Sequence, residues 1–526
     1  MSETGKLIRI YDTTLRDGCQ AEGMSLSVAD KLEVAQRLDD LGVHYIEGGF
    51  AGANPKDEQF FRQARSLDLK NARLASFGAT RRKKVSAAED AGLKALLQAE
   101  TPVVCLVGKA WPYHVTNVIR TTLDENLRMV EDSVRHLKAA GREVIMDAEH
   151  FFDGCVDDPD YALKVVRVAA EAGADCVVLC DTNGGALPDQ VGRWTALAVA
   201  QVRCPVGIHC HNDCGLAVAN SVAAVQNGAV HVQGTLNGFG ERAGNADLCS
   251  ILPIINLKTP HHCISAEQLT RLTEVSRFAY EAANLIHNEH QPFVGSSAFA
   301  HKAGQHVDAM RKADAACEQI APELVGNERR FLLSELSGHA TVLAKMQVFA
   351  IAKDDDTIAK LVAELKRLEN AGYQYEAAEA SFELLAHRMA GNLKPHFEVK
   401  AYHVSCTRQS DGSLVTDATV KINVNGHKMH TASEGDGPVN ALDGALRKAL
   451  EPHYPALKHM HLTDYRVRVI NPGRATAARV RVVIQSGDDK RVWGTVGVSE
   501  NIIDASWKAL LDSFEYELLL AESAPH

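Results

Sequence analysis

The sequence predicts an α/β fold: a (β/α)8 TIM barrel, then a helical subdomain and a duplicated βββα domain. Three observations lead to this prediction. Short β-rich runs alternate with amphipathic segments up to about residue 260, the alternation then stops, and the order βββα occurs twice after residue 396. Eight βα units within about 250 residues are typical of a closed parallel barrel. An open, doubly wound sheet is the alternative.

The eight predicted strands are runs of β-branched and aliphatic residues bounded by turn signals. They cover residues 7–15, 44–49, 73–79, 103–108, 143–150, 176–182, 205–211 and 230–238. Segments such as "SVADKLEVAQRLDDLG" between them have helical periodicity. In "DLGVHYIE" a glycine ends the helix directly before a buried strand. The repeated order of strand and helix indicates parallel strands.

The pattern changes after the predicted barrel, which we place at residues 1–265. The segment "SAEQLTRLTEVSRFAYEAANLI" begins with a helix-capping signature, and residues 354–370 and 373–390 also have helical periodicity. We expect a helical subdomain and linker at 266–391. Two tandem βββα units predict a small duplicated domain at 392–526.

Composition limits the classes of function. The 526 residues contain 56 Lys and Arg against 67 Asp and Glu, a net charge of -11, which disfavours a nucleic-acid partner. The basic run "TRRKK" at 80–84 is interpreted as a solvated helix face. No segment approaches the roughly 20 apolar residues of a membrane span, and the first residues have no apolar leader region. With twelve cysteines that lack a disulfide framework, we expect a cytoplasmic protein without membrane contact.

Polar side chains collect where the predicted barrel strands end. Arg16 and Asp17 follow the first strand, Glu47 ends the second, Asp147 and Glu149 end the fifth, Thr182 ends the sixth, and His209 and His211 end the seventh. The carboxyl ends of barrel strands meet at one mouth, where active sites are built. We therefore expect these side chains to share a pocket.

The stretch "GIHCHND" is the strongest local signal for a metal site. Because side chains two residues apart lie on the same face of a strand, His209 and His211 can offer two imidazoles to one ion. Asp17 can add a carboxylate oxygen, and the glycine-rich "NGFGERAGNADL" places Asn245 where a loop can fold over the ion. Such mixed ligands suit Mg²⁺, Mn²⁺ or Zn²⁺.

Eight stretches of the chain resemble one enzyme family. They are "YDTTLRDGCQ", "YIEGGFAGANPKD", "DAEHFFDG", "LCDTNGG", "GIHCHNDCGLAVANS", "VQGTLNGFGERAGNADL", "AFAHKAGQHVDA" and "VGNERRFLLSELSG". They are similar to the metal-dependent acyl-CoA-condensing family of isopropylmalate, homocitrate and citramalate synthases, over nearly the whole chain. "EGGFAGANPKD" and "DAEHFFDG" most resemble the citramalate branch. The resemblance implies condensation of acetyl-CoA with pyruvate to citramalate and CoA, the first step of a pyruvate route to isoleucine.

The resemblance also implies roles for single residues. Asp17, His209, His211 and Asn245 become ligands of a divalent metal ion. Arg16 becomes the group that holds the carboxylate of the 2-oxo acid and polarises its carbonyl, which a planar guanidinium does well. Of the adjacent Arg and Asp in "LRDG", the arginine is thus expected to bind the substrate and the aspartate the metal ion.

A base must remove a methyl proton from acetyl-CoA, and three side chains are candidates by position. They are Glu149, Glu47 and His306, with Thr182 as a polar orienter of the substrate. Glu47 has the alternative role of charge partner to Arg16, and either role places it at the substrate.

The family carries a tyrosine near the segment "AACEQIAPELVGN", where this chain has Cys317, and this departure weakens the assignment of the base. Other 2-oxo acids, as in isopropylmalate and homocitrate synthases, remain alternatives. A retro-aldol lyase of the 3-hydroxy-3-methylglutaryl-CoA type and a non-enzymatic metal-binding protein are further alternatives. The loop "NGFGERAGNADL" and the C-terminal domain favour synthesis.

The C-terminal domain contains none of the predicted metal ligands. Its resemblance to the regulatory domain of the family implies a homodimer that is feedback-inhibited by a branched-chain amino acid, with isoleucine as the expected effector. A dimerisation domain without a ligand is the alternative. Unequal binding of the effector to two states of the enzyme is what such inhibition requires.

Overall fold

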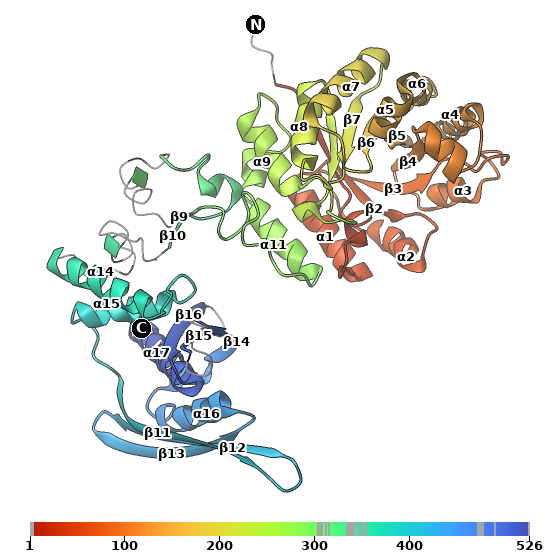
Figure 1. The fold of residues 1–526 in the computed structure, drawn as a ribbon. Helices are drawn as coiled ribbons and strands as arrows, with labels where there is room; N and C mark the ends of the chain where they lie inside the picture. The colour runs from red at the N-terminus through yellow and green to blue at the C-terminus, as the bar shows by residue number, and fades with distance from the viewer. Residues whose placement is uncertain are drawn as a thin grey trace. The chain divides into compact units, whose positions relative to one another are not determined.

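The computed structural model is shown in Figure 1. It describes residues 5–301, 309–310, 313, 316–332, 342–343, 346, 349, 351, 355–470, 478–488 and 491–523. The chain forms two compact units, one of Met1–Phe299 with Ile320–Glu328 and one of Ala300–Gln319 with Arg329–His526. In the part of the chain that is described, no helix is both long and apolar enough to cross a membrane.

The first unit contains the predicted closed barrel of eight parallel strands in sequence order. The strands are β1 (Arg9–Asp12), β2 (Tyr45–Phe50), β3 (Arg73–Ala79), β4 (Val103–Lys109), β5 (Glu143–Glu149), β6 (Cys176–Asp181), β7 (Val206–Cys210) and β8 (His231–Gly234). Parallel pairing of β1 with β8 closes the barrel, so the barrel prediction is confirmed and the open sheet is wrong.

Helices surround the barrel on its outside (Figure 1). They are α1 (Val28–Leu41), α2 (Pro55–Ala64), α3 (Ala91–Gln98), α4 (Leu123–Ala139), α5 (Phe151–Asp157), α6 (Pro159–Glu171), α7 (Pro188–Gln201), α8 (Ala217–Gln226) and α9 (Leu248–Lys258). The helix α1 has a capping box at Ser27 and ends at Gly42 with φ 90°, the left-handed conformation that glycine adopts at low cost. The barrel is thus assembled from locally specified βα units.

Alternating side chains of the strands fill two different cores. One set packs inside the barrel: Tyr11, Tyr45, Ala75, Phe77, Val103, Cys105, Ile145, Cys176, Val178 and Cys180. The other set packs outward against the helices in one large apolar cluster. Because the barrel interior is filled, only the ends of the strands are left to hold a ligand.

The first strand ends earlier than predicted. The sequence predicts a strand over 7–15, but β1 ends at Asp12, whose Oδ1 accepts a hydrogen bond from the backbone N–H of Thr14 at 2.9 Å. A short polar side chain that binds nearby backbone competes with sheet pairing. The chain therefore turns, and Arg16 and Asp17 lie in the loop after β1 rather than on the strand.

After the barrel, α10 (Ala266–Leu269) and α11 (Leu272–Ala282) complete the helices of the first unit. The helix α10 starts with a capping box at Ser265, as its sequence predicts. The short helix η4 (Pro322–Val325) belongs to the same unit. The second unit begins with the paired two-residue strands β9 (Ala300–His301) and β10 (Arg330–Phe331).

The second unit contains the predicted duplicated βββα arrangement. It has α14 (Asp355–Asn370) and α15 (Glu379–Met389), then β11 (Phe397–Arg408), β12 (Leu414–Val424), β13 (His427–Gly435), α16 (Pro438–Leu450), β14 (His461–Val469), β15 (Val480–Gly487), β16 (Val492–Ser499) and α17 (Ile502–Ser523). Each antiparallel three-stranded sheet packs against the helix that follows it, and one apolar cluster joins both halves. The prediction of a tandem repeat is confirmed.

Candidate active site

Three predicted ligands meet at the mouth of the barrel. Oδ2 of Asp17 lies 3.5 Å from Nε2 of His209 and 4.0 Å from Nε2 of His211. The two Nε2 atoms are 3.4 Å apart, and the three ligand atoms all lie within 4.8 Å of one another. All three residues are buried. One ion could contact an atom of each.

Backbone contacts between loops bring the fourth predicted ligand to the same place. His211 follows β7 and forms an isolated antiparallel bridge with Asn245. The backbone N–H of His211 donates to the carbonyl of Asp181 at 3.1 Å, and that of Ala246 donates to the carbonyl of Cys210 at 2.9 Å. These backbone hydrogen bonds hold the loop after β8 against the end of β7.

The glycine-rich loop leaves room for Asn245. A Cβ atom on Gly240, which has φ 154°, would lie 2.3 Å from the Asn245 amide nitrogen. That nitrogen donates to the carbonyl of Phe239 at 3.1 Å. The amide oxygen of Asn245 is buried and has no hydrogen-bond partner among the described residues. A buried acceptor without a donor is costly, and a cation would satisfy it.

The charges of the cluster also suit a divalent cation. Burial raises the pKa of Asp17, but Arg16 and the two histidines outweigh burial, so the net pKa is lowered and the group is an anion. Burial lowers the pKa of His209, and it lowers that of His211 to about 4. Metal ligands must be deprotonated in this way. The residues present therefore fit a metal ion.

Arg16 is held beside the cluster by two carboxylates and a ring. Its Nε lies 2.6 Å from Oε2 of Glu47, and its Nη1 lies 3.0 Å from Oδ2 of Asp17. The guanidinium carbon lies 3.8 Å from the centre of the Phe77 ring, within the range of a cation–π interaction. The side chain is only 12% exposed, so its guanidinium plane is fixed before a substrate arrives.

Glu47 is fully enclosed and accepts several hydrogen bonds. Besides Arg16, the hydroxyl of Tyr11 donates to it at 2.7 Å, and the hydroxyl of Thr13 also donates to it. A carboxylate with three donors and no solvent contact is poorly placed to take a proton from a substrate. This geometry favours the role of charge partner to Arg16 over that of base.

Glu149 and Thr182 lie at the ends of neighbouring strands, as predicted. Glu149 ends β5 and forms an ion pair with Lys109 at the end of β4; both side chains are about a quarter exposed, at 24% and 23%. The Thr182 hydroxyl accepts from the backbone N–H of His150 at 2.8 Å. His306 lies outside the described residues, so its position relative to Glu149 is not given by the structure.

Cys317 is exposed, and its backbone N–H lies 3.2 Å from the sulfur of Met310. It belongs to the second unit, whereas the metal-ligand cluster belongs to the first.

Two more buried residues adjoin the cluster, and sequence reasoning missed one of them, Gln233. Gln233 on β8 bonds to His209, and it donates a hydrogen bond to Asp147 on β5. Asp147 is among the strand-end residues that the sequence places in the shared pocket, without this contact. The available signal for Gln233 was a polar side chain inside the otherwise buried run "VHVQGT". Burial raises the pKa of Asp147 to about 7.

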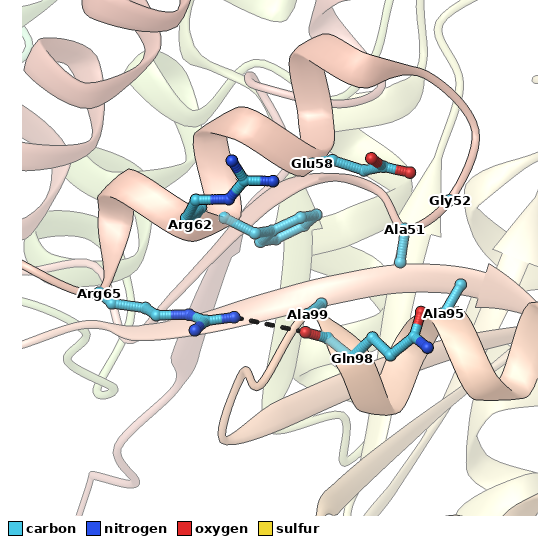
Figure 2. A pocket seen from close by; sticks show the side chains of 9 residues that line it. Ala51, Gly52, Glu58, Arg62, Arg65, Ala95, Gln98 and Ala99 are labelled. Atoms are coloured by element: carbon cyan, nitrogen blue, oxygen red, sulfur yellow. Dashed lines mark hydrogen bonds between the residues drawn. The ribbon is translucent and has the colours of Figure 1, made fainter.

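A separate hollow of about 220 Å³ lies between α2 and α3 (Figure 2). Glu58 and Arg62 of α2 and Arg65 just after it face Gln98 of α3 across it, and Arg65 donates to the backbone carbonyl of Gln98 at 3.4 Å. None of the predicted site residues lines this hollow. The metal-ligand cluster at the barrel mouth is therefore the better candidate for a catalytic centre.

Comparison with known proteins gives consistent matches along the chain. The HMGL-like family matches residues 7–278, the homocitrate synthase post-HMGL domain-like family matches 293–372, and the LeuA allosteric (dimerisation) domain matches 376–518. The (R)-citramalate synthases of Geobacter sulfurreducens and Aquifex aeolicus are each 51% identical over 519 residues, 98% of this chain and of theirs. That of Sulfolobus acidocaldarius is 44% identical over 98% of this chain and 97% of its own. The chain belongs to the HMGL-like family and, within it, to the (R)-citramalate synthases.

Proposed function

We propose that the chain is an acyltransferase that converts acetyl-CoA, pyruvate and water to citramalate and CoA, the first step of a pyruvate route to isoleucine. The observation that carries the proposal is the buried cluster of Asp17, His209 and His211 beside the fixed guanidinium of Arg16. This arrangement suits a 2-oxo acid, which presents a carboxylate next to a carbonyl. Similarity to (R)-citramalate synthases over nearly the whole chain supports pyruvate as that acid.

Asp17, His209, His211 and Asn245 are the proposed holders of a divalent cation, Mg²⁺, Mn²⁺ or Zn²⁺. When bound, the cation supplies Lewis-acid stabilisation of the negative charge that develops on the 2-oxo oxygen. The protein's contribution is a dry, preorganised set of one carboxylate, two neutral imidazoles and one amide oxygen. These ligands need little rearrangement when the ion enters.

Arg16 is the proposed binder of the pyruvate carboxylate. Its guanidinium is held in plane by Glu47 and by the Phe77 ring, so the entropy of orienting it is spent before the substrate binds. Thr182 is the proposed polar orienter at the opposite side of the mouth. The role of Glu47 is then to position Arg16.

Glu149 is the proposed general base. It takes a methyl proton from acetyl-CoA, and the resulting enolate carbon forms a bond to C2 of pyruvate. The electron pair of the C2 carbonyl bond moves to its oxygen, which takes up a proton and becomes the hydroxyl of the product. Water then cleaves the thioester and releases CoA. The partial exposure of Glu149 and of its ion-pair partner Lys109 supports this choice over the enclosed Glu47. His306 stays a second proposed participant in proton transfer.

The test uses the purified full-length chain with acetyl-CoA and a divalent metal, and measures release of the free thiol of CoA. Pyruvate should give the highest kcat/KM in a panel with 2-oxobutanoate, 2-oxoisovalerate and 2-oxoglutarate. A higher value with 2-oxoisovalerate or 2-oxoglutarate would make the chain an isopropylmalate or homocitrate synthase instead. Cleavage of a 3-hydroxyacyl-CoA without condensation would support a lyase.

We also propose a division into a barrel at 1–265, a helical subdomain at 266–391 and a regulatory, dimer-forming domain at 392–526. The match of 376–518 to the LeuA allosteric (dimerisation) domain supports a homodimer with isoleucine as effector. Binding of isoleucine, leucine and valine to the full-length chain, measured with inhibition, tests the effector. All twelve cysteines are free, which supports a reducing, cytoplasmic location.

A further inference from the structure

We propose that Gln233 and Asp147 are positioning residues that hold His209 in the tautomer able to bind the metal ion. The inference rests on the proposed metal site and adds a layer of residues beneath it. Nδ1 of His209 lies 2.9 Å from Oε1 of Gln233, and Nε2 of Gln233 lies 2.9 Å from Oδ1 of Asp147. The three side chains form one continuous chain of hydrogen bonds.

The tautomer of His209 decides whether it can be a ligand. An imidazole nitrogen binds a cation through its lone pair, so the nitrogen facing the ion must carry no proton. In His209 this nitrogen is Nε2, which faces Asp17 at 3.5 Å and His211 at 3.4 Å. A neutral ring must then carry its proton on Nδ1, and that proton needs an acceptor.

The carboxylate of Asp147 decides which end of the Gln233 amide faces His209. Above its raised pKa of about 7, Asp147 is a carboxylate whose oxygens only accept hydrogen bonds, so at the pH of 8 used for the titrations the amide NH₂ of Gln233 must point toward Asp147. The amide oxygen is left pointing at Nδ1 of His209, where it accepts the ring proton. Reversing the amide would place its oxygen against the Asp147 carboxylate, which is repulsive.

These three side chains are buried in the barrel, so water has little access to take over their hydrogen bonds. The exposed fraction is 0% for Gln233, 3% for Asp147 and 5% for His209. His209 and Gln233 are direct partners in the pairing of β7 with β8, and Asp147 reaches Gln233 from β5. With little access for water, the partner of Nδ1 of His209 is the Gln233 amide oxygen, at 2.9 Å.

His211 provides an internal contrast. Its Nδ1 is buried and has no hydrogen-bond partner among the described residues. Of the two histidines, only His209 is therefore oriented by a side chain among the described residues. Residues that orient a metal-binding histidine typically change metal affinity by 10–100-fold when they are replaced. We expect the Gln233→Leu substitution to weaken metal binding by about 10–100-fold, acting through His209.

Two further variants separate orientation from simple loss of packing. In Gln233→Glu, the new carboxylate accepts the His209 proton but faces the Asp147 carboxylate, so metal affinity should fall. In the double variant Gln233→Glu with Asp147→Asn, the new amide donates to the new carboxylate. The order of donors and acceptors is restored, and the double variant should recover most of the lost affinity.

The measurement is calorimetric titration, at pH 8, of the metal-free, full-length chain with Co²⁺, together with the visible absorption of the bound Co²⁺ and the thermal unfolding of each metal-free variant. The control is Asn256→Leu. The Asn256 amide also uses both ends, donating to the carbonyl of Ile264 and accepting from the N–H of Cys263, each at 2.8 Å. This control should lose stability and keep its Co²⁺ affinity.

Three outcomes would overturn the inference while leaving the metal site intact. They are wild-type affinity in Gln233→Leu, no recovery in the double variant relative to Gln233→Glu, and an equal loss of affinity in Asn256→Leu. Failure of the wild-type chain to bind Co²⁺ would overturn the proposed metal site and this inference together. Weaker binding and a changed Co²⁺ spectrum in Gln233→Leu, with rescue in the double variant, is the result that supports it.

Discussion

Replacing Arg16 by methionine should abolish turnover and spare metal binding. Methionine keeps the apolar stem that packs near Phe77 but removes the guanidinium, which lies 2.6 Å from Glu47 and 3.0 Å from Asp17. A hydrogen bond to a charged group contributes about 1.5–3 kcal/mol, and a guanidinium makes two of them to a carboxylate. The loss of about 3–5 kcal/mol corresponds to roughly 10²- to 10⁴-fold in kcat/KM for pyruvate.

The metal affinity of the Arg16→Met variant should not fall with its kcat/KM. Oδ2 of Asp17 is shared between Arg16 and the metal-ligand cluster, so removing Arg16 frees that oxygen and removes a nearby positive charge. The affinity for Mn²⁺, measured by calorimetry, should stay at the wild-type value or rise. In His211→Ala a ligand is lost, and metal binding and thiol release should fall together.

The substitution also leaves the buried carboxylate of Glu47 without its cation. Breaking a buried ion pair on one side costs about 3–5 kcal/mol of unfolding free energy, and Tyr11 and Thr13 offset part of this by continued donation. The companion variant Arg16→Met with Glu47→Gln removes both charges. It leaves no unpaired buried carboxylate, so the metal affinity can be measured on a folded protein. If Mn²⁺ affinity in these variants fell as far as in His211→Ala, the separate roles of Arg16 and Asp17 would be refuted. A loss below tenfold in kcat/KM would refute the carboxylate contact.

Three other predictions concern the same chain. Phe77→Leu removes the ring beneath Arg16 and should raise KM for pyruvate about two- to fivefold, from a cation–π contribution of about 0.5–1 kcal/mol; an unchanged KM would contradict it. Removal of metal with a chelator should stop thiol release, and added Mg²⁺, Mn²⁺ or Zn²⁺ should restore it; full activity in the chelator would exclude a metal role. The hydrogen bond that the His396 ring donates to the carboxylate of Glu515 raises the pKa of His396, so its stabilisation is complete below the unfolded value and is lost as pH rises through the raised pKa. Hydrogen exchange of β11 should therefore lose protection as the pH rises above the ordinary histidine pKa in the wild type and not in His396→Gln, and equal pH dependence in both would count against this pair.

The barrel could be predicted because its information is local. Strand and helix periodicity, the glycine at the end of α1 and the capping box at Ser265 each act within a few residues, and eight repeats of that unit close into a barrel. The alternation of side chains along β7 was enough to place His209 and His211 on one face. The family resemblance added Asn245, whose place depends on a glycine-rich loop with little regular pattern.

Other features depended on contacts between distant parts of the chain. The early end of β1 follows from the hydrogen bond of Asp12 to Thr14, which competes with a strand pattern that looked continuous. The sequence alone left Glu47 as either a general base or the charge partner of Arg16. Its three hydrogen-bond donors lie on β1 and the loop after it, and only the pairing of β1 with β2 brings them to Glu47. A strand pattern specifies which face a residue is on, and it carries no information about which residue lies across that face.

The link from His209 to Asp147 shows the same limit most clearly. Gln233 lies 24 residues from His209 and 86 from Asp147 along the chain, yet it bonds to both. The sequence by itself determined the barrel, the position of its mouth and the types of ligand gathered there. Only the tertiary structure decided which hydrogen bond each buried polar group makes, because burial removes water as a partner and closure of the barrel selects the neighbours that replace it.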